Sequence, residues 1–187
     1  MSLYPRRNAS LLAVFQERKM VFILLLGFSS GLPLYLTSRT LQAWLTIEGV
    51  DLTTIGLFSL VAIPYSLKFA WSPILDRFSL SRLGRRRGWM ICSQILLLVS
   101  IATMALVNPS ESITLVATVA ISIAFLSATQ DIAIDAYRTD ILQQREIGAG
   151  AALNVLGYRL ALIITGAGAL ILADTGTPLT HHLEANF

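Results

Sequence analysis

The distribution of arginine and lysine is the feature that most constrains how this chain can fold. Eleven of its 14 basic residues fall in three short stretches that alternate with long apolar runs. They are Arg6, Arg7, Arg18, Lys19, Arg77, Arg82, Arg85, Arg86, Arg87, Arg138 and Arg145. The other short connections carry only the acidic residues Glu48, Asp51 and Glu111. Because basic residues collect in cytoplasmic loops, the pattern predicts a polytopic membrane protein whose N-terminus and two arginine loops face the cytoplasm.

The composition agrees with a membrane setting. The chain is 55% hydrophobic and 13% charged, whereas a soluble domain is about 25% charged. Its net charge of +3 could suggest nucleic acid, but the cations flank apolar runs and do not form one basic face. Attraction to anionic lipid of the inner leaflet explains them more simply. We therefore expect the lipid bilayer, and no nucleic acid, as a partner.

Five apolar runs are long enough to cross about 30 Å of hydrocarbon as helices. They cover residues 20–44, 54–71, 89–107, 113–134 and 148–173. The expected fold is thus an all-α membrane domain over residues 20–173, between a cytoplasmic segment (1–19) and a polar tail (174–187) on the periplasmic side. The first run is too long for a cleaved signal peptide.

The sequence indicates no metal or cofactor. Cys92 is the only cysteine, which excludes a disulfide framework or a cysteine metal cluster. His181 and His182 stand in the polar tail without further ligand types nearby. We expect these two histidines to be solvated.

The first span contains Gly27 and Gly31, four positions apart, followed by Pro33. Small residues at this spacing let a neighbouring helix approach closely. Proline removes a backbone hydrogen bond and should kink the helix. Two interpretations stay open: a packing notch, or a bend that moves during transport or shapes a cavity.

Three cations, Arg39, Lys68 and Arg159, lie within or near the spans, where charge is costly unless it meets a partner or a wet cavity. At 1.5 Å per residue, Arg159 is about 17 Å from the cytoplasmic start of its span, close to the midplane. Asn154 and Tyr158 are nearby in sequence. Arg159 can be a substrate ligand or part of a structural ion pair. Lys68 lies toward the cytoplasmic side, and Arg39 toward the outer end.

Two carboxylates mark the cytoplasmic end of the fourth span. Asp131 and Asp135 are four residues apart and therefore share a helix face. Like charges stacked in a poorly solvated place repel each other, which suits proton binding and release. The same pair could equally form a structural charge network with Lys68 or the loop arginines.

The connection between the second and third spans contains Asp76 and Arg77, then Gly84 and the run Arg85, Arg86 and Arg87. An Asp-Arg pair followed by glycine and arginines resembles the signature loop of the major facilitator superfamily. In that superfamily the loop carries a charge network that helps to hold one conformation of the transporter. An arginine loop without such a network would serve as a topology anchor.

Several segments together resemble the AmpG-type muropeptide permease family of that superfamily. They are residues 27–33 (GFSSGLP), 41–44 (LQAW), 84–89 (GRRRGW), 130–136 (QDIAIDA), 148–152 (GAGAA) and 156–159 (LGYR). The resemblance runs from Leu24 to Asp174. It implies proton-driven uptake of anhydro-muropeptides, sugar–peptide products of cell-wall turnover, from the periplasm across the inner membrane, and no enzymatic activity.

The charges suit such a substrate, because arginine binds carboxylates by paired hydrogen bonds. We expect Arg159, with Tyr158 and Asn154, to bind the substrate near the midplane. Arg39 would attract the anion at the outer mouth. The cluster of Asp131, Asp135 and Lys68 would couple protons or form a gate.

Members of the resembled family have at least twelve spans in two halves, so five spans predict a truncated or partial chain that needs the missing C-terminal half. Acetyl-coenzyme A is the alternative anionic substrate. A further interpretation is that the chain is a membrane fragment that does not transport. A membrane enzyme could use Asp131 and Asp135 as metal ligands or as a protease dyad, but the sequence has no Gly-x-Gly-Asp or His-Glu-x-x-His motif.

Overall fold

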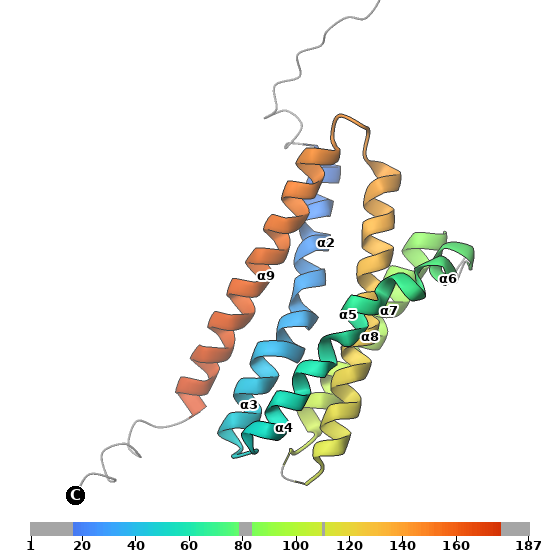
Figure 1. The fold of residues 1–187 in the computed structure, drawn as a ribbon. Helices are drawn as coiled ribbons and strands as arrows, with labels where there is room; N and C mark the ends of the chain where they lie inside the picture. Colours follow the sequence, from blue (N-terminus) through green and yellow to red (C-terminus); the bar gives the residue numbers. More distant parts are fainter. Residues whose placement is uncertain (1–16, 79–83, 110, 177–187) are drawn as a thin grey trace, which may run out of the picture.

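The computed structural model of the chain describes residues 17–78, 84–109 and 111–176, and every regular element in these ranges is a helix (Figure 1). Within these described ranges, five stretches are long and apolar enough to cross a membrane. They are Arg18–Ile47, Leu52–Ala70, Arg86–Leu106, Ile113–Ile141 and Ile147–Gly168. The structure confirms the predicted all-α polytopic fold and its five spans.

The first span is one long helix with an irregular middle. It comprises α2 (Arg18–Tyr35), the π-helical turn η1 (Leu36–Thr40) and α3 (Leu41–Ile47). Pro33 stands inside α2. The Thr37 and Ser38 hydroxyls donate to the carbonyl oxygens of Pro33 and Leu34, at 3.0 and 2.7 Å. The irregularity expected at Pro33 thus takes the form of a π turn just after it, where side chains supply hydrogen bonds to the backbone.

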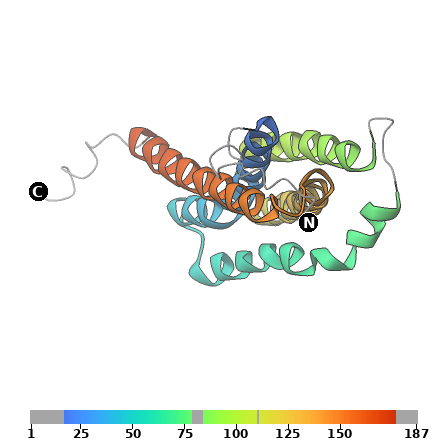
Figure 2. The same cartoon turned by 90° about the horizontal axis from the view of Figure 1, so that it is seen from above.

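The second span is segmented, whereas the sequence analysis expected one run over residues 54–71. It comprises α4 (Leu52–Leu57), the 3-10 turn η2 (Phe58–Ala62), α5 (Ile63–Leu67) and the 3-10 turn η3 (Lys68–Ala70), and α6 (Ser72–Arg77) follows. Pro64 and Pro73 stand in the first turns of α5 and α6, where a missing N–H is tolerated. Figure 2 shows this segmented stretch along one side of the bundle.

The last three spans are regular helices: α7 (Arg85–Leu106), α8 (Ile113–Ile141) and α9 (Ile147–Gly176). Helix α9 continues beyond the Ala173 end that the sequence predicted. The rest of the tail, with His181 and His182, lies outside the described residues, as do Arg6, Arg7 and Arg82.

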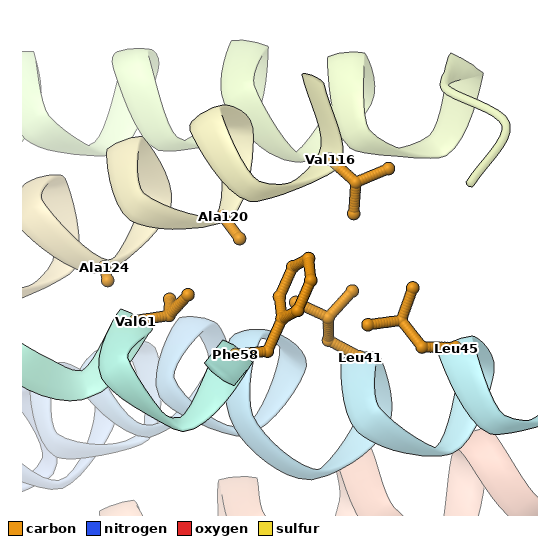
Figure 3. Close-up of a cluster of buried hydrophobic side chains, with 7 residues drawn as sticks. All are labelled: Leu41, Leu45, Phe58, Val61, Val116, Ala120 and Ala124. Carbon is orange, nitrogen blue, oxygen red and sulfur yellow. The ribbon is translucent and has the colours of Figure 1, made fainter. Parts of the chain in front are cut away.

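Helix α8 is the centre of the bundle and packs against α7, α2 and α5. One apolar cluster joins α8 to α3 and η2 (Figure 3). It consists of Leu41, Leu45, Phe58, Val61, Val116, Ala120 and Ala124. In Figure 3 the Phe58 ring points from η2 toward α8. By contrast, Phe69, Leu98 and Leu106 are 70%, 70% and 88% exposed, as apolar side chains on lipid-facing surfaces are.

Helices α2 and α9 approach each other backbone to backbone. A Cβ atom added at Gly27 would overlap the Asn154 carbonyl, and one at Gly31 would lie 2.8 Å from the Tyr158 carbonyl oxygen. On the opposite helix, a Cβ at Gly157 would overlap the Leu24 carbonyl. The interpretation of Gly27 and Gly31 as a packing notch is therefore confirmed, and the notch faces α9.

The elements that carry the basic clusters point toward the same end of the bundle. The start of α2, the end of α6 with the start of α7, and the α8–α9 turn lie toward the upper end in Figure 1, while the end of α3 with the start of α4, and the end of α7 with the start of α8, lie at the lower end. This arrangement is the one that the alternation of basic and acidic connections requires.

Candidate functional site

Two carboxylates and one ammonium group meet where α8 passes η3. Lys68 Nζ lies 3.8 Å from Oδ2 of Asp131 and 3.8 Å from Oδ2 of Asp135. Arg138, three residues further along α8, lies 3.1 Å from the other carboxylate oxygen of Asp135. Two cations therefore face two carboxylates. Among the described residues Asp135 pairs with both cations, whereas Asp131 pairs with Lys68 alone.

Asp131 is the more secluded of the two carboxylates. Its side chain is 18% exposed, against 48% for Asp135. The hydroxyl of Ser30, a buried residue of α2, donates to Oδ1 of Asp131. Sequence reasoning did not assign Ser30 to the site. The sequence did offer one indication of Ser30: it is a hydroxyl residue between Gly27 and Gly31, on the helix face where a neighbouring helix was expected to approach closely.

A cavity of about 170 Å³ adjoins this cluster between α2, α8 and α9. Its lining consists of Ser30, Asp131, Ile134, Asp135, Asn154, Val155 and Tyr158. The Oδ1 atom of Asn154 is buried and accepts no hydrogen bond from any described group. The structure thus brings Asn154 and Tyr158, which were expected to bind substrate, together with the aspartates.

Arg159 does not share this cavity. It follows Tyr158 directly, so its side chain leaves α9 about 100° further round the helix. Arg159 is exposed and pairs with no carboxylate among the described residues, and the same holds for Arg39 in η1. A guanidinium at that depth needs a wet or protein-lined surface. The substrate-binding roles of Arg159 and Arg39 stay predictions.

A second charge network joins the end of α6 and the start of α7 to α8. Arg86 forms an ion pair with Asp76, and its Nε lies 3.3 Å from Oδ2 of Asp140. The Arg87 guanidinium lies over the Tyr137 ring, 5.9 Å from its centroid. Arg86 thus links α6 to α8 through Asp76 and Asp140, and the role of this network stays a prediction.

Two further arginines, Arg77 and Arg85, were expected in the same charge loop. Arg77, at the end of α6, is exposed and has no ion-pair partner among the described residues. Arg85 is the first residue of α7, and its side chain lies outside the described part of the chain.

One ion pair was missed altogether. Lys19 Nζ lies 2.8 Å from each carboxylate oxygen of Glu146, which is 1% exposed at the turn before α9. The Gln143 N–H also donates to this carboxylate, at 2.9 Å. Hydrogen bonding by Lys19, and then by Gln143, lowers the pKa of Glu146. The pair fastens the start of α2 to the start of α9 across 127 positions of sequence.

Taken together, these features define a multi-pass helical membrane protein with an ion-paired carboxylate cluster between α8 and η3. The chain belongs to the family whose model is described as acetyl-coenzyme A transporter 1, which matches residues 19–177.

Relatives are named as permeases and transporters. The anhydromuropeptide permease of Escherichia coli (strain K12) is 53% identical over 167 residues, which are 89% of this chain and 34% of the relative. "Putative transporter AmpG 4" of Rickettsia felis is 42% identical over 165 residues, covering 86% of this chain and 40% of the relative. This chain thus spans about a third of the length of such relatives, and it resembles the muropeptide permeases as the sequence indicated.

Proposed function

We propose that this chain forms part of a proton-coupled transporter that carries anhydro-muropeptides from the periplasm to the cytoplasm, across the bacterial inner membrane. The name of the Escherichia coli permease, at 53% identity, supports the substrate. Because the chain spans 34% of that relative, transport is proposed for a full-length protein that contains this segment. The basic ends of the bundle support a cytoplasmic N-terminus and a periplasmic end for α9. No enzymatic step is proposed.

The observation that carries the coupling mechanism is the position of Lys68, 3.8 Å from both Asp131 and Asp135. The one ammonium group of Lys68 is shared between two carboxylates. Asp135 has Arg138 as a second partner, whereas Asp131 is secluded and depends on Lys68. A proton on Asp131 would remove the less solvated charge and let Lys68 pair fully with Asp135. Asp131 is therefore the proposed proton carrier, and Asp135 the fixed partner.

The loop network has a separate proposed role. Arg86 connects Asp76 of α6 to Asp140 of α8, so it holds the end of α6 and the start of α7 near the end of α8. This contact would stabilise the conformation that is closed at the cytoplasmic end. Breaking it would favour opening at that end.

The coupling proposal is tested by Asp131→Asn and Asp135→Asn in a chimera that carries this segment in place of the matching segment of the Escherichia coli permease. Proton-driven accumulation and substrate counterflow are measured on the same vesicles. Asp131→Asn should reduce accumulation by about tenfold or more, because a proton that crosses about 100 mV supplies about 2.3 kcal/mol and the variant cannot carry that proton. Counterflow should survive, since substrate exchange needs no net proton movement. Undiminished accumulation by Asp131→Asn would contradict the proposal, and loss of both activities would favour a structural role.

Acetyl-coenzyme A is the second candidate substrate, because the matching family model bears its name. A competition experiment distinguishes the two candidate substrates. Uptake of a labelled anhydro-muropeptide by the chimera should be inhibited by unlabelled anhydro-muropeptide and not by acetyl-coenzyme A. The reverse result would make acetyl-coenzyme A the substrate.

A further inference from the structure

The volume of the cavity beside Asp131 limits which molecules can occupy it. Its volume is about 170 Å³, whereas pockets for drug-sized molecules measure about 300–1,000 Å³. A sugar–peptide substrate does not fit in this space. A few water molecules do, at about 30 Å³ each in liquid, where each has two to four polar partners.

The lining supplies such partners from three helices. Ser30 comes from α2, Asp131 from α8, and Asn154 and Tyr158 from α9. The Asn154 Oδ1 atom is buried and accepts no hydrogen bond from any described group. A buried carbonyl oxygen without a partner costs about 1–3 kcal/mol. Asn154 therefore holds an unused hydrogen-bond acceptor at the wall of the cavity.

The backbone beneath these two α9 residues is held firmly. A Cβ added at Gly27 would overlap the carbonyl of Asn154, and one at Gly31 would lie 2.8 Å from the carbonyl oxygen of Tyr158. The close approach of α2 thus fixes where both side chains leave α9. Groups held in this way can position water beside Asp131 without contacting the substrate.

We propose that this cavity holds a short chain of water through which Asp131 exchanges its proton, and that Asn154 and Tyr158 position that water. This inference rests on the proposed role of Asp131 as the proton carrier. It replaces the expectation that these two α9 residues bind substrate.

The exchange is a simple proton transfer. A hydronium ion delivered along the water chain gives its proton to a carboxylate oxygen of Asp131 and becomes water. The carboxyl group is then neutral, and Lys68 remains paired with Asp135. On release, the proton returns to the same water chain. The groups that face Asp131 are Ser30 from α2, Lys68 from η3, Asp135 from α8, Tyr158 from α9 and Tyr65 from α5.

The experiment uses Tyr158→Phe and Asn154→Leu in the chimera, with Tyr137→Phe as the matched control. Tyr137 packs under Arg87 and does not line the cavity. Proton-driven accumulation is measured as a function of external pH, and counterflow as a function of substrate concentration. Each cavity variant should lower the rate of accumulation by about tenfold, as loss of one hydrogen-bonding group does, and should shift its pH profile. The half-saturating concentration in counterflow should not change, and the control should behave as the parent.

Further measurements distinguish a role in positioning water from a role in binding substrate. Asn154→Ser restores an oxygen atom and should recover part of the accumulation that Asn154→Leu loses. A raised half-saturating concentration in Tyr158→Phe or Asn154→Leu would make these residues substrate ligands and overturn the inference. A third result is unchanged accumulation in both Tyr158→Phe and Asn154→Leu, while Asp131→Asn no longer couples transport to protons. That result would overturn the inference and leave the proposed function standing. Coupled accumulation by Asp131→Asn would overturn both.

Discussion

At the scale of single residues, the Lys19–Glu146 pair makes a prediction about stability. Lys19→Met should destabilise the protein, because it leaves a carboxylate that is 1% exposed without its cation. The double variant Lys19→Met with Glu146→Gln should recover part of the loss, since it removes both charges. The measurement is the midpoint of thermal unfolding in detergent. Arg18→Gln is the control, because it makes the same change in charge at an exposed neighbour. Equal effects of Lys19→Met and Arg18→Gln would contradict the importance of the pair.

The same pair predicts a pH dependence. Lys19 lowers the pKa of Glu146 in the folded protein below that of a free glutamate, which is about 4.3. The stabilisation is therefore fully present above that value and is lost as the pH falls through the lowered pKa. The unfolding midpoint of the parent should fall faster with acidification below about pH 4.3 than that of the double variant. If the unfolding midpoints of the parent and the double variant fell in parallel with pH, the pair would contribute no pH-dependent stability.

Arg159 makes a separate prediction about binding. In the chimera, Arg159→Ala should raise the half-saturating substrate concentration in counterflow by about tenfold or more, as loss of a paired carboxylate contact does. Arg159→Lys should rescue poorly, because an ammonium group cannot reproduce the planar fork of arginine. The amount of protein in the membrane, measured alongside, should stay at the parent level. Normal affinity in Arg159→Ala would remove this residue from the substrate site.

At the scale of elements, the glycine contacts between α2 and α9 are open to a direct test. Gly157→Ala should destabilise the protein by about 1–3 kcal/mol, the usual cost of overpacking, because its Cβ would overlap the Leu24 carbonyl. Gly166→Ala on the same helix is the control, since its Cβ meets nothing within 4 Å. The two variants are compared by unfolding in detergent. A similar loss in both would attribute the effect to glycine itself and not to the contact.

The five spans could be predicted from sequence because hydrocarbon thickness imposes a length and composition that a chain displays locally. The segmentation of the second span was not predicted, although Pro64 and Pro73 were visible. Hydropathy averages over a window and does not report whether the turns inside it are α or 3-10.

The site was predictable in part for a similar reason. Asp131 and Asp135 share a face by their spacing alone, so a charge cluster could be expected. Pairing with Lys68 was one of the expected alternatives, and the structure shows it. The contact of Asp131 with Ser30 depends on how α2 packs against α8, and no local pattern encodes that packing. The Lys19–Glu146 pair spans 127 positions and escaped notice for the same reason. Asn154, Tyr158 and Arg159 are neighbours in sequence, yet helical geometry separates Arg159 from the cavity that the other two line.

At the scale of the whole molecule, the arrangement of the ends predicts membrane topology. With Cys92 replaced, a cysteine at Glu48 or Glu111 should react with an impermeant thiol reagent added from the periplasm. One at Gln144, an exposed position of the α8–α9 turn, should react only after the membrane is made permeable. The labelling is measured in intact cells that express the chimera. The reverse pattern would overturn the proposed orientation.

The backbone contact between α2 and α9 also has a consequence for biogenesis. Lys19 and Glu146 are separated by 127 positions, and at translation rates of about 5–20 residues per second that interval lasts on the order of ten seconds. The first helix therefore enters the membrane with its glycine face uncovered and Lys19 without Glu146, until the fifth helix emerges. During that time lipid or the insertion machinery must cover the surface that α9 will occupy.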